Sequence, residues 1–92
     1  MRILVTGAAG RLGGRLVQVL NEQGHSVAGI DVVGDNVTPL DITNFEATRA
    51  FIGDLKPDIV IHPAGWTDVE GCAREPEKAI SKFESRVSTM LQ

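Results

Sequence analysis

Residues 2–14 read RILVTGAAGRLGG, and this stretch decides the fold predicted for the chain. A short apolar run leads into three glycines spaced three residues apart, and a helical pattern follows. Gly7 would supply a turn that a Cβ would strain, Gly10 would let the backbone approach a pyrophosphate, and Gly13 would let the helix pack closely against the strand. The unpaired N–H groups at the start of that helix would face the anion. We therefore predict a strand, a phosphate-binding turn and a helix.

The second predicted strand, Ser26–Asp31, ends in an acidic residue, Asp31. The C-terminal ends of parallel strands form one edge of a sheet, so Asp31 should lie beside the glycine turn and accept hydrogen bonds from the adenosine ribose. Its charge would repel a 2′-phosphate, which favours NAD over NADP. Arg11 keeps NADP open, because a cation at the turn could compensate that phosphate. The alternative for Asp31 is a solvated acid in a turn.

The composition restricts the possible partners. The chain has 92 residues, a formal net charge of −3 and one cysteine. A negative charge argues against nucleic acid and against anionic membrane surfaces as the main partner. A lone cysteine allows no intrachain disulfide and fits a reducing compartment. No apolar run approaches the roughly 20 residues of a membrane span, so we expect a cytoplasmic protein and no membrane partner.

The glycine turn opens a predicted helix that stops at Gly24. Its apolar stripe is predicted to contain Leu12, Leu16, Val19 and Leu20. A brief extended piece follows at 37–40. Thr43 and Glu46 form a capping-box pattern that predicts the start of a second helix, which ends at Lys56-Pro57.

The third predicted strand is Ile59–His62, which is solidly apolar up to its final histidine. His62 could contact a cofactor or substrate, or it could be a core histidine satisfied by the backbone. A polar loop is predicted over Trp66–Arg74, where Trp66 either stacks on a ligand or covers the core, and Cys72 fills apolar space. A final amphipathic helix is predicted from Pro76 to the end, with the apolar stripe Ile80, Phe83, Val87 and Met90.

The predicted fold class is α/β: a Rossmann-like parallel sheet with flanking helices, forming the N-terminal half of a doubly wound fold. We expect one partial domain over residues 1–92, with three strands in the order 3-2-1. In that order the outer edge of the first strand has no partner. An apolar unpaired edge invites pairing, so we expect a homo-oligomer, formed edge to edge or through the last helix.

Three segments resemble one enzyme family. Val5–Gly13 is similar to the cofactor turn of extended short-chain dehydrogenases/reductases, the NAD-dependent epimerase/dehydratase superfamily. Lys56–Cys72 and Glu75–Ala79 resemble segments of the dTDP-4-dehydrorhamnose reductase branch. The resemblance covers roughly residues 1–80. Two departures are His62-Pro63, where the family has Asn-Ala, and residues 80–86, which lack the family's pattern.

The resemblance implies a set of cofactor-binding residues. The turn would contact the pyrophosphate and the nicotinamide side through Gly7, Ala9, Gly10, Arg11 and Leu12, with Gly13 completing the motif. The adenosine ribose would be held by Asp31 and Val32, and the adenine would be flanked by Asp41 and Ile42. The far ribose and the nicotinamide would be lined by Pro63, Ala64, Gly65 and Thr67.

Catalysis in this family uses a Ser or Thr and a Tyr-x-x-x-Lys pair, whose tyrosine donates a proton to the carbonyl. This sequence contains no tyrosine, and we assign it no catalytic residue and no metal ligand. The resemblance therefore predicts the NAD- or NADP-binding portion of a sugar-nucleotide reductase or epimerase, truncated before the substrate domain and inactive alone. A sugar nucleotide would be the partner of the full-length form. The alternative is a non-catalytic nucleotide-binding regulatory or interaction module that self-associates.

Overall fold

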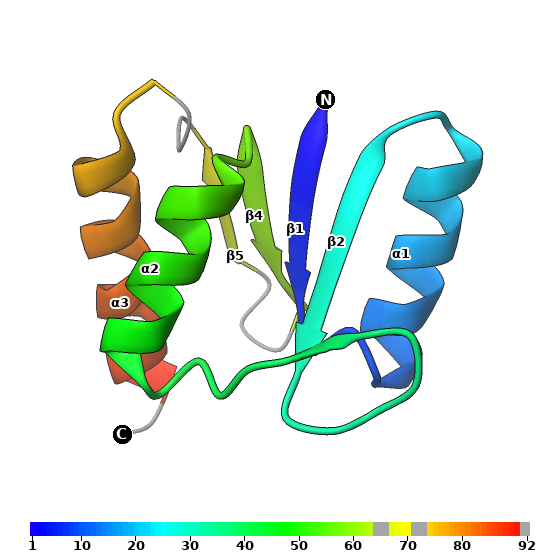
Figure 1. Ribbon diagram of the computed structural model, residues 1–92, viewed down its shortest axis with the longest axis horizontal. Coiled ribbons are helices and arrows are strands. Elements are labelled where there is room, and N and C mark those ends of the chain that lie inside the picture. The colour runs from blue at the N-terminus through cyan, green and yellow to red at the C-terminus, as the bar shows by residue number, and fades with distance from the viewer. Residues whose placement is uncertain (64–66, 71–73, 91–92) are drawn as a thin grey trace.

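A computed structural model of the chain describes residues 1–63, 67–70 and 74–90. Within these residues one five-stranded sheet lies between helices on its two faces (Figure 1). The elements are β1 (Arg2–Thr6), α1 (Arg11–Glu22), β2 (Ser26–Asp31), β3 (Thr38–Pro39), α2 (Phe45–Leu55), β4 (Ile59–His62), β5 (Thr67–Glu70) and α3 (Pro76–Met90). The Rossmann-like α/β class predicted from the sequence is confirmed.

The strand order is β3-β2-β1-β4-β5. The pairs β1–β2, β1–β4 and β2–β3 are parallel, and β4–β5 is antiparallel. The predicted order 3-2-1 is therefore wrong in one respect: the third predicted strand, β4, lies against β1 and not beyond β2. A crossover through α2 carries the chain from β3 back past β2 and β1, so the strand order reverses between β1 and β4.

The position of β4 removes the reason for predicting self-association. Ile3, Leu4 and Val5 pair with β2 on one side and with β4 on the other, so β1 is central and has no free edge. The predicted polar loop at Trp66–Arg74 is also corrected, because Thr67–Glu70 forms β5 and pairs with β4. The outer edge of β4 is thereby covered as well.

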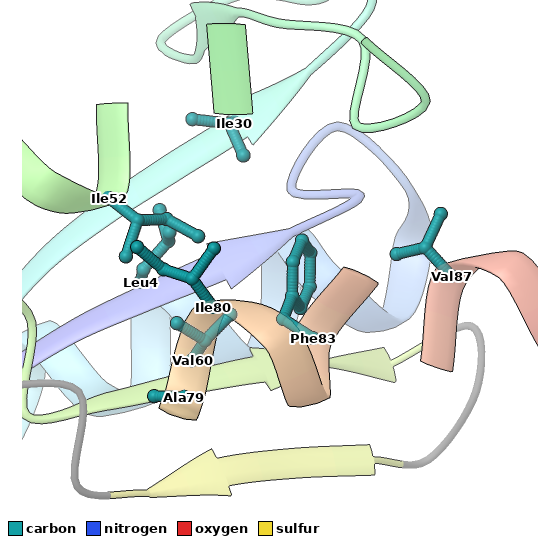
Figure 2. Close-up of a cluster of buried hydrophobic side chains, with 8 residues drawn as sticks. All are labelled: Leu4, Ile30, Ile52, Val60, Ala79, Ile80, Phe83 and Val87. Carbon is teal, nitrogen blue, oxygen red and sulfur yellow. The ribbon is translucent and has the colours of Figure 1, made fainter. Parts of the chain in front are cut away.

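Two hydrophobic clusters hold the helices to the sheet. The side chains of β1 alternate, so Leu4 packs toward α2 and α3 while Ile3 and Val5 pack toward α1. Figure 2 shows the larger cluster, in which Phe83 of α3 lies near residues of β1 and β4. Its buried members are Leu4, Ile30, Ile52, Val60, Ala79, Ile80, Phe83 and Val87. The apolar stripe predicted for α3 is confirmed at Ile80, Phe83 and Val87, whereas the side chain of Met90 is not described.

The buried face of α1 differs from the predicted stripe. Gly13 is the buried residue of the helix, and Leu16, Val17 and Leu20 pack with β1 at three, four and seven residues beyond it. Leu12 is 46% exposed. The helix is oriented by the glycine that approaches the strand most closely, and this rotation turns Leu12 outward.

Helix α2 begins one residue later than the capping box predicts. The N-cap is Asn44, whose Oδ1 accepts the N–H of Ala47 at 3.2 Å. Thr43 instead donates its hydroxyl to Asp41. Helix α2 is tied to α3 through Arg49, which lies 2.8 Å from a carboxylate oxygen of Glu77 and 2.5 Å from one of Glu84.

Gly53 provides a test of helix propensity without packing changes. A Cβ at this position of α2 would meet no heavy atom within 4 Å. We expect Gly53→Ala to raise the free energy of unfolding by about 0.5–1 kcal/mol, because alanine loses less backbone entropy on folding. The measurement is urea denaturation followed by circular dichroism. The control, Gly24→Ala, also meets open space but has φ +90°, so it should lower the stability; a stabilised Gly24→Ala would contradict the backbone argument.

Candidate functional site

The candidate site lies at the C-terminal ends of β1, β2 and β4. This edge carries the glycine turn after Thr6, the carboxylate of Asp31 and the ring of His62. The strand order reverses between β1 and β4, and in open α/β sheets ligands bind in the crevice beside such a reversal. The topology therefore brings the glycine turn, Asp31 and His62, which are far apart in the sequence, to the same edge of the sheet.

The glycine turn has the geometry predicted for it. Gly7 has φ +63°, a left-handed conformation that favours glycine, and its carbonyl accepts the N–H of Gly10 at 3.1 Å. A Cβ on Gly13 would lie 2.2 Å from the carbonyl oxygen of Gly7 and 2.8 Å from its carbonyl carbon. No L side chain fits this contact, so Gly13 is what allows α1 to begin directly against the turn.

The start of α1 has features of an anion-binding helix terminus. Its N-cap is Gly10, no side chain caps it, and its first turn contains no acidic residue. The N–H groups of residues 11–13 precede the first intrahelical bond, which Gly14 donates to the carbonyl of Gly10 at 2.8 Å. The positive end of the helix dipole is therefore uncompensated by acidic residues of the helix itself. These residues fit the diphosphate of a dinucleotide.

Asp31 lies beside the turn, as predicted. Its Oδ2 accepts the N–H of Ala9 at 3.0 Å, and its Oδ1 accepts the N–H of Val32 at 2.7 Å. The carboxylate is thus not a freely solvated turn acid but a link between the end of β2 and the glycine turn. Each carboxylate oxygen has a further lone pair, so the group can still accept hydrogen bonds from a ribose.

The loop after β2 packs against the same turn. A Cβ on Gly34 would lie 2.5 Å from the Cβ of Ala9, and Gly34 has φ +143°. Val32 and Val33 are 61% and 78% exposed at this edge. No local sequence pattern indicates the contact of Gly34 with the turn, because Ala9 lies in a distant part of the chain.

Asp41 and Ile42 begin the link from β3 to α2. Asp41 accepts the hydroxyl of Thr43 at 2.7 Å and the N–H of Thr43 at 2.9 Å, and these hydrogen bonds hold the pKa of its carboxyl below the ordinary value. Ile42 is partly buried against the α2–α3 face of the core. The two predicted adenine neighbours are therefore oriented by local hydrogen bonds and by core packing.

His62 is buried at the end of β4, with 3% exposure. Its Nδ1 lies 2.5 Å from the Oγ1 of Thr6, and its ring meets Phe83 edge to face at a centroid distance of 6.0 Å. Burial lowers the pKa of His62. The histidine belongs to the core, as one alternative predicted, and the hydroxyl of Thr6 is one of its partners.

The remaining predicted site residues follow β4. Pro63 is buried directly after the strand, and Thr67 pairs with His62 in the β4–β5 register. Ala64 and Gly65 lie outside the described residues, as do Trp66 and Cys72.

A separate cavity lies on the α1 side of the sheet. Its volume is about 210 Å³, and it is lined by Ala8, Gly14, Val17, Gly29, Asp35, Asn36 and Val37. None of the predicted cofactor-binding residues lines it. Among the described residues, no helix is both long and apolar enough to cross a bilayer, and no group of three or more His, Cys, Asp or Glu side chains is arranged to hold a metal ion.

Comparison with known families assigns the chain. The sequence profile of the RmlD substrate binding domain matches residues 1–90. The chain belongs to this family. The match confirms the resemblance to dTDP-4-dehydrorhamnose reductases and extends it beyond residue 80, so the unusual tail is still part of the RmlD-type domain.

Individual RmlD-type relatives agree with this assignment. The chain is 40% identical over 91 residues to a probable dTDP-4,6-dihydroxy-2-methyloxan-3-one 4-ketoreductase of Streptomyces antibioticus, covering 99% of this chain and 29% of that protein. It is 36% identical over 80 residues to the dTDP-4-dehydrorhamnose reductase of Streptomyces griseus, covering 87% and 25%. The chain spans about a quarter of the length of the curated relatives that it matches.

A solved structure shares the fold. The UDP-glucose 4-epimerase of Thermus thermophilus, determined as a complex with NAD, superimposes with a TM-score of 0.60 and 30% sequence identity. The alignment covers 83% of this chain and 28% of the epimerase. The fold of this RmlD-type domain is therefore that of the epimerases and related Rossmann enzymes.

Two adjacent glycines of α1 test the close approach of helix and turn. We expect Gly13→Ala to destabilise the protein by more than about 2 kcal/mol, because its Cβ would overlap the backbone of Gly7 and the turn would have to move. Gly14→Ala is the matched control: its Cβ would lie 3.2 Å from the carbonyl oxygen of Ala8, a contact that a shift of a few tenths of an ångström relieves. Thermal unfolding of both variants decides the matter, and equal melting temperatures would refute the assigned role of Gly13.

Proposed function

We propose that this chain binds a nicotinamide adenine dinucleotide across the C-terminal ends of β1, β2 and β4. It would form the cofactor-binding part of a sugar-nucleotide reductase of the dTDP-4-dehydrorhamnose reductase type. The observation that carries the proposal is the uncapped start of α1 held against Gly7, with the carboxylate of Asp31 bonded to the same turn. These are the groups that a diphosphate and an adjacent ribose require.

The roles of the residues follow from their chemistry. Backbone N–H groups at the start of α1 would bind the diphosphate, and Asp31 would accept the ribose hydroxyls while Val32 covers the sugar. Asp41 and Ile42 would flank the adenine. The segment after β4, with Pro63, Ala64, Gly65 and Thr67, would line the nicotinamide end.

We propose NAD(H) as the preferred cofactor. A 2′-phosphate would be brought close to the charge of Asp31, which is fixed in place by two N–H groups and cannot turn away without losing them. Arg11 is exposed at the start of α1 and is the cation that could favour NADP(H). The complex of the related Thermus epimerase contains NAD, in agreement with the preferred assignment.

The bound cofactor would supply hydride, and in the full enzyme a 4-keto sugar nucleotide would accept it. The substrate class is supported by the names of the relatives, which are reductases and epimerases of nucleotide-linked sugars. This chain's own residues would bind and orient the dinucleotide. With no tyrosine in the sequence, the proton donor expected for this family must come from elsewhere.

The preference for NAD(H) is tested by Asp31→Ala. We expect the variant to bind NADH about ten- to a hundredfold more weakly, because a charged acceptor of ribose hydrogen bonds is lost, while NADPH binding changes much less. The readout is the ratio of the two dissociation constants from fluorescence titration. This ratio is insensitive to the lost bond to Ala9, since both dinucleotides use the same turn. Asp35→Ala, an exposed acid in the same loop, should keep the wild-type ratio. An unchanged ratio in Asp31→Ala would rule out the ribose role.

Turnover is tested separately from binding. We expect the chain alone to bind NADH but to leave a dTDP-4-keto-6-deoxy sugar unreduced in an assay of NADH absorbance, because it lacks the tyrosine that donates the proton in this family. A full-length dTDP-4-dehydrorhamnose reductase serves as the positive control. Measurable reduction by the purified chain would show that a residue of this sequence replaces the tyrosine.

A further inference from the structure

Two residues that end β2 or follow it meet the same residue of the glycine turn, Ala9. The Oδ2 of Asp31 accepts the N–H of Ala9 at 3.0 Å. Gly34 lies three residues farther along the chain, and a Cβ built on it would stand 2.5 Å from the Cβ of Ala9 and 3.7 Å from its Cα. Ala9 is therefore contacted at its backbone by Asp31 and at its side chain by Gly34.

Position 34 favours glycine for two separate reasons. Its φ of +143° is a conformation that L side chains rarely adopt. A side chain at this position would also overlap Ala9, and it would lie 3.3 Å from the Cγ2 of Val37, which is already a tight contact. The overlap with Ala9 is the more severe of the two. A substituted loop would therefore have to move away from the glycine turn.

Such a movement acts on the carboxylate of Asp31. Its Oδ1 accepts the N–H of Val32, the next residue in the chain, at 2.7 Å, whereas its Oδ2 accepts the N–H of Ala9 from the turn. Only the bond to Ala9 joins β2 to the turn, so this is the bond that a separation of loop and turn lengthens. A carboxylate bonded to two amides has a fixed direction, and one that keeps a single amide can rotate.

We propose that Gly34 is a positioning residue for the choice between NAD(H) and NADP(H): it lets the loop of residues 32–37 lie on Ala9 and so keeps Asp31 bonded to the turn. The inference rests on the proposed function, in which Asp31 accepts the ribose hydroxyls. A carboxylate with a fixed direction repels a 2′-phosphate, whereas a carboxylate that can rotate turns its charge away from the phosphate. Gly34 thus acts on cofactor preference through Asp31.

The first measurement uses the free chain and needs no ligand. NMR spectra report the chemical shift of the Ala9 amide proton, which is sensitive to a hydrogen bond to a carboxylate. We expect this shift to change in Gly34→Ala in the same direction as in Asp31→Ala, where the bond is absent, and to stay at the wild-type value in Gly24→Ala. An Ala9 amide of Gly34→Ala that keeps the wild-type shift would overturn the proposal.

The second measurement is the ratio of the dissociation constants of NADPH and NADH, obtained by fluorescence titration. We expect Gly34→Ala to lower this ratio about three- to tenfold, because the charge of Asp31 is no longer fixed beside the ribose. Gly24→Ala is the matched control for backbone strain: its φ is +90° and its Cβ meets open space, so it should keep the wild-type ratio. A merely structural role of Gly34 would weaken the binding of both dinucleotides alike. An unchanged ratio in folded Gly34→Ala would therefore contradict the proposal.

A double-mutant cycle separates the contact with Ala9 from the strain at position 34. Ala9→Gly removes the methyl group that a side chain at position 34 would overlap, and the nearest remaining atom is then the Cγ2 of Val37 at 3.3 Å. In the Ala9→Gly background we expect Gly34→Ala to change the ratio by less than about twofold. Equal losses of preference in both backgrounds would assign the effect to strain and overturn the proposal.

The cycle also decides the outcome if Gly34→Ala alone does not fold. We then expect the double variant Ala9→Gly/Gly34→Ala to regain the fold and the ratio of Ala9→Gly, because the overlap is gone. A double variant that stays unfolded, or that folds without this preference, would refute the role of the contact. If neither dinucleotide binds the wild type, the proposed function fails, and the Ala9 amide shift still decides whether Gly34 positions Asp31.

Discussion

The structure depends on the close approach of α1 to the carbonyl of Gly7. Only a residue without a Cβ can stand at position 13, where a side-chain atom would lie 2.2 Å from that oxygen. The contact sets the rotation of the helix, so Leu16, Val17 and Leu20 pack on the sheet and Leu12 faces outward. The same contact places the uncapped N–H groups at the start of α1 at the C-terminal edge of the sheet. One contact therefore sets both the packing of α1 and the direction of its uncapped N–H groups.

A second set of contacts ties this turn to its neighbours. Asp31 bonds to Ala9 from β2, Gly34 packs on Ala9 from the following loop, and His62 meets Thr6 from β4. The turn is thus held from both sides of β1, in the centre of the sheet and not at its margin. A phosphate-binding loop needs such support, because its backbone groups must keep their directions before the ligand arrives.

The family assignment places the candidate site within a larger class of proteins. The RmlD-type match includes residues 1–90, yet the chain spans about a quarter of its curated relatives. The matched quarter contains the glycine turn, the acidic residue after β2 and the reversal of strand order. In the proposed function these features bind the dinucleotide.

The sequence by itself determined the local elements: β1, β2 and β4, the left-handed Gly7, the acid at position 31 and the buried face of α3. Each follows from apolar periodicity or from the steric freedom of glycine over a few neighbouring residues. The tertiary structure decided that β4 lies beside β1, that α1 packs Val17 against the sheet, and that His62 bonds to Thr6. These outcomes depend on a long crossover and on contacts between residues far apart in the chain, and no local pattern carries that information.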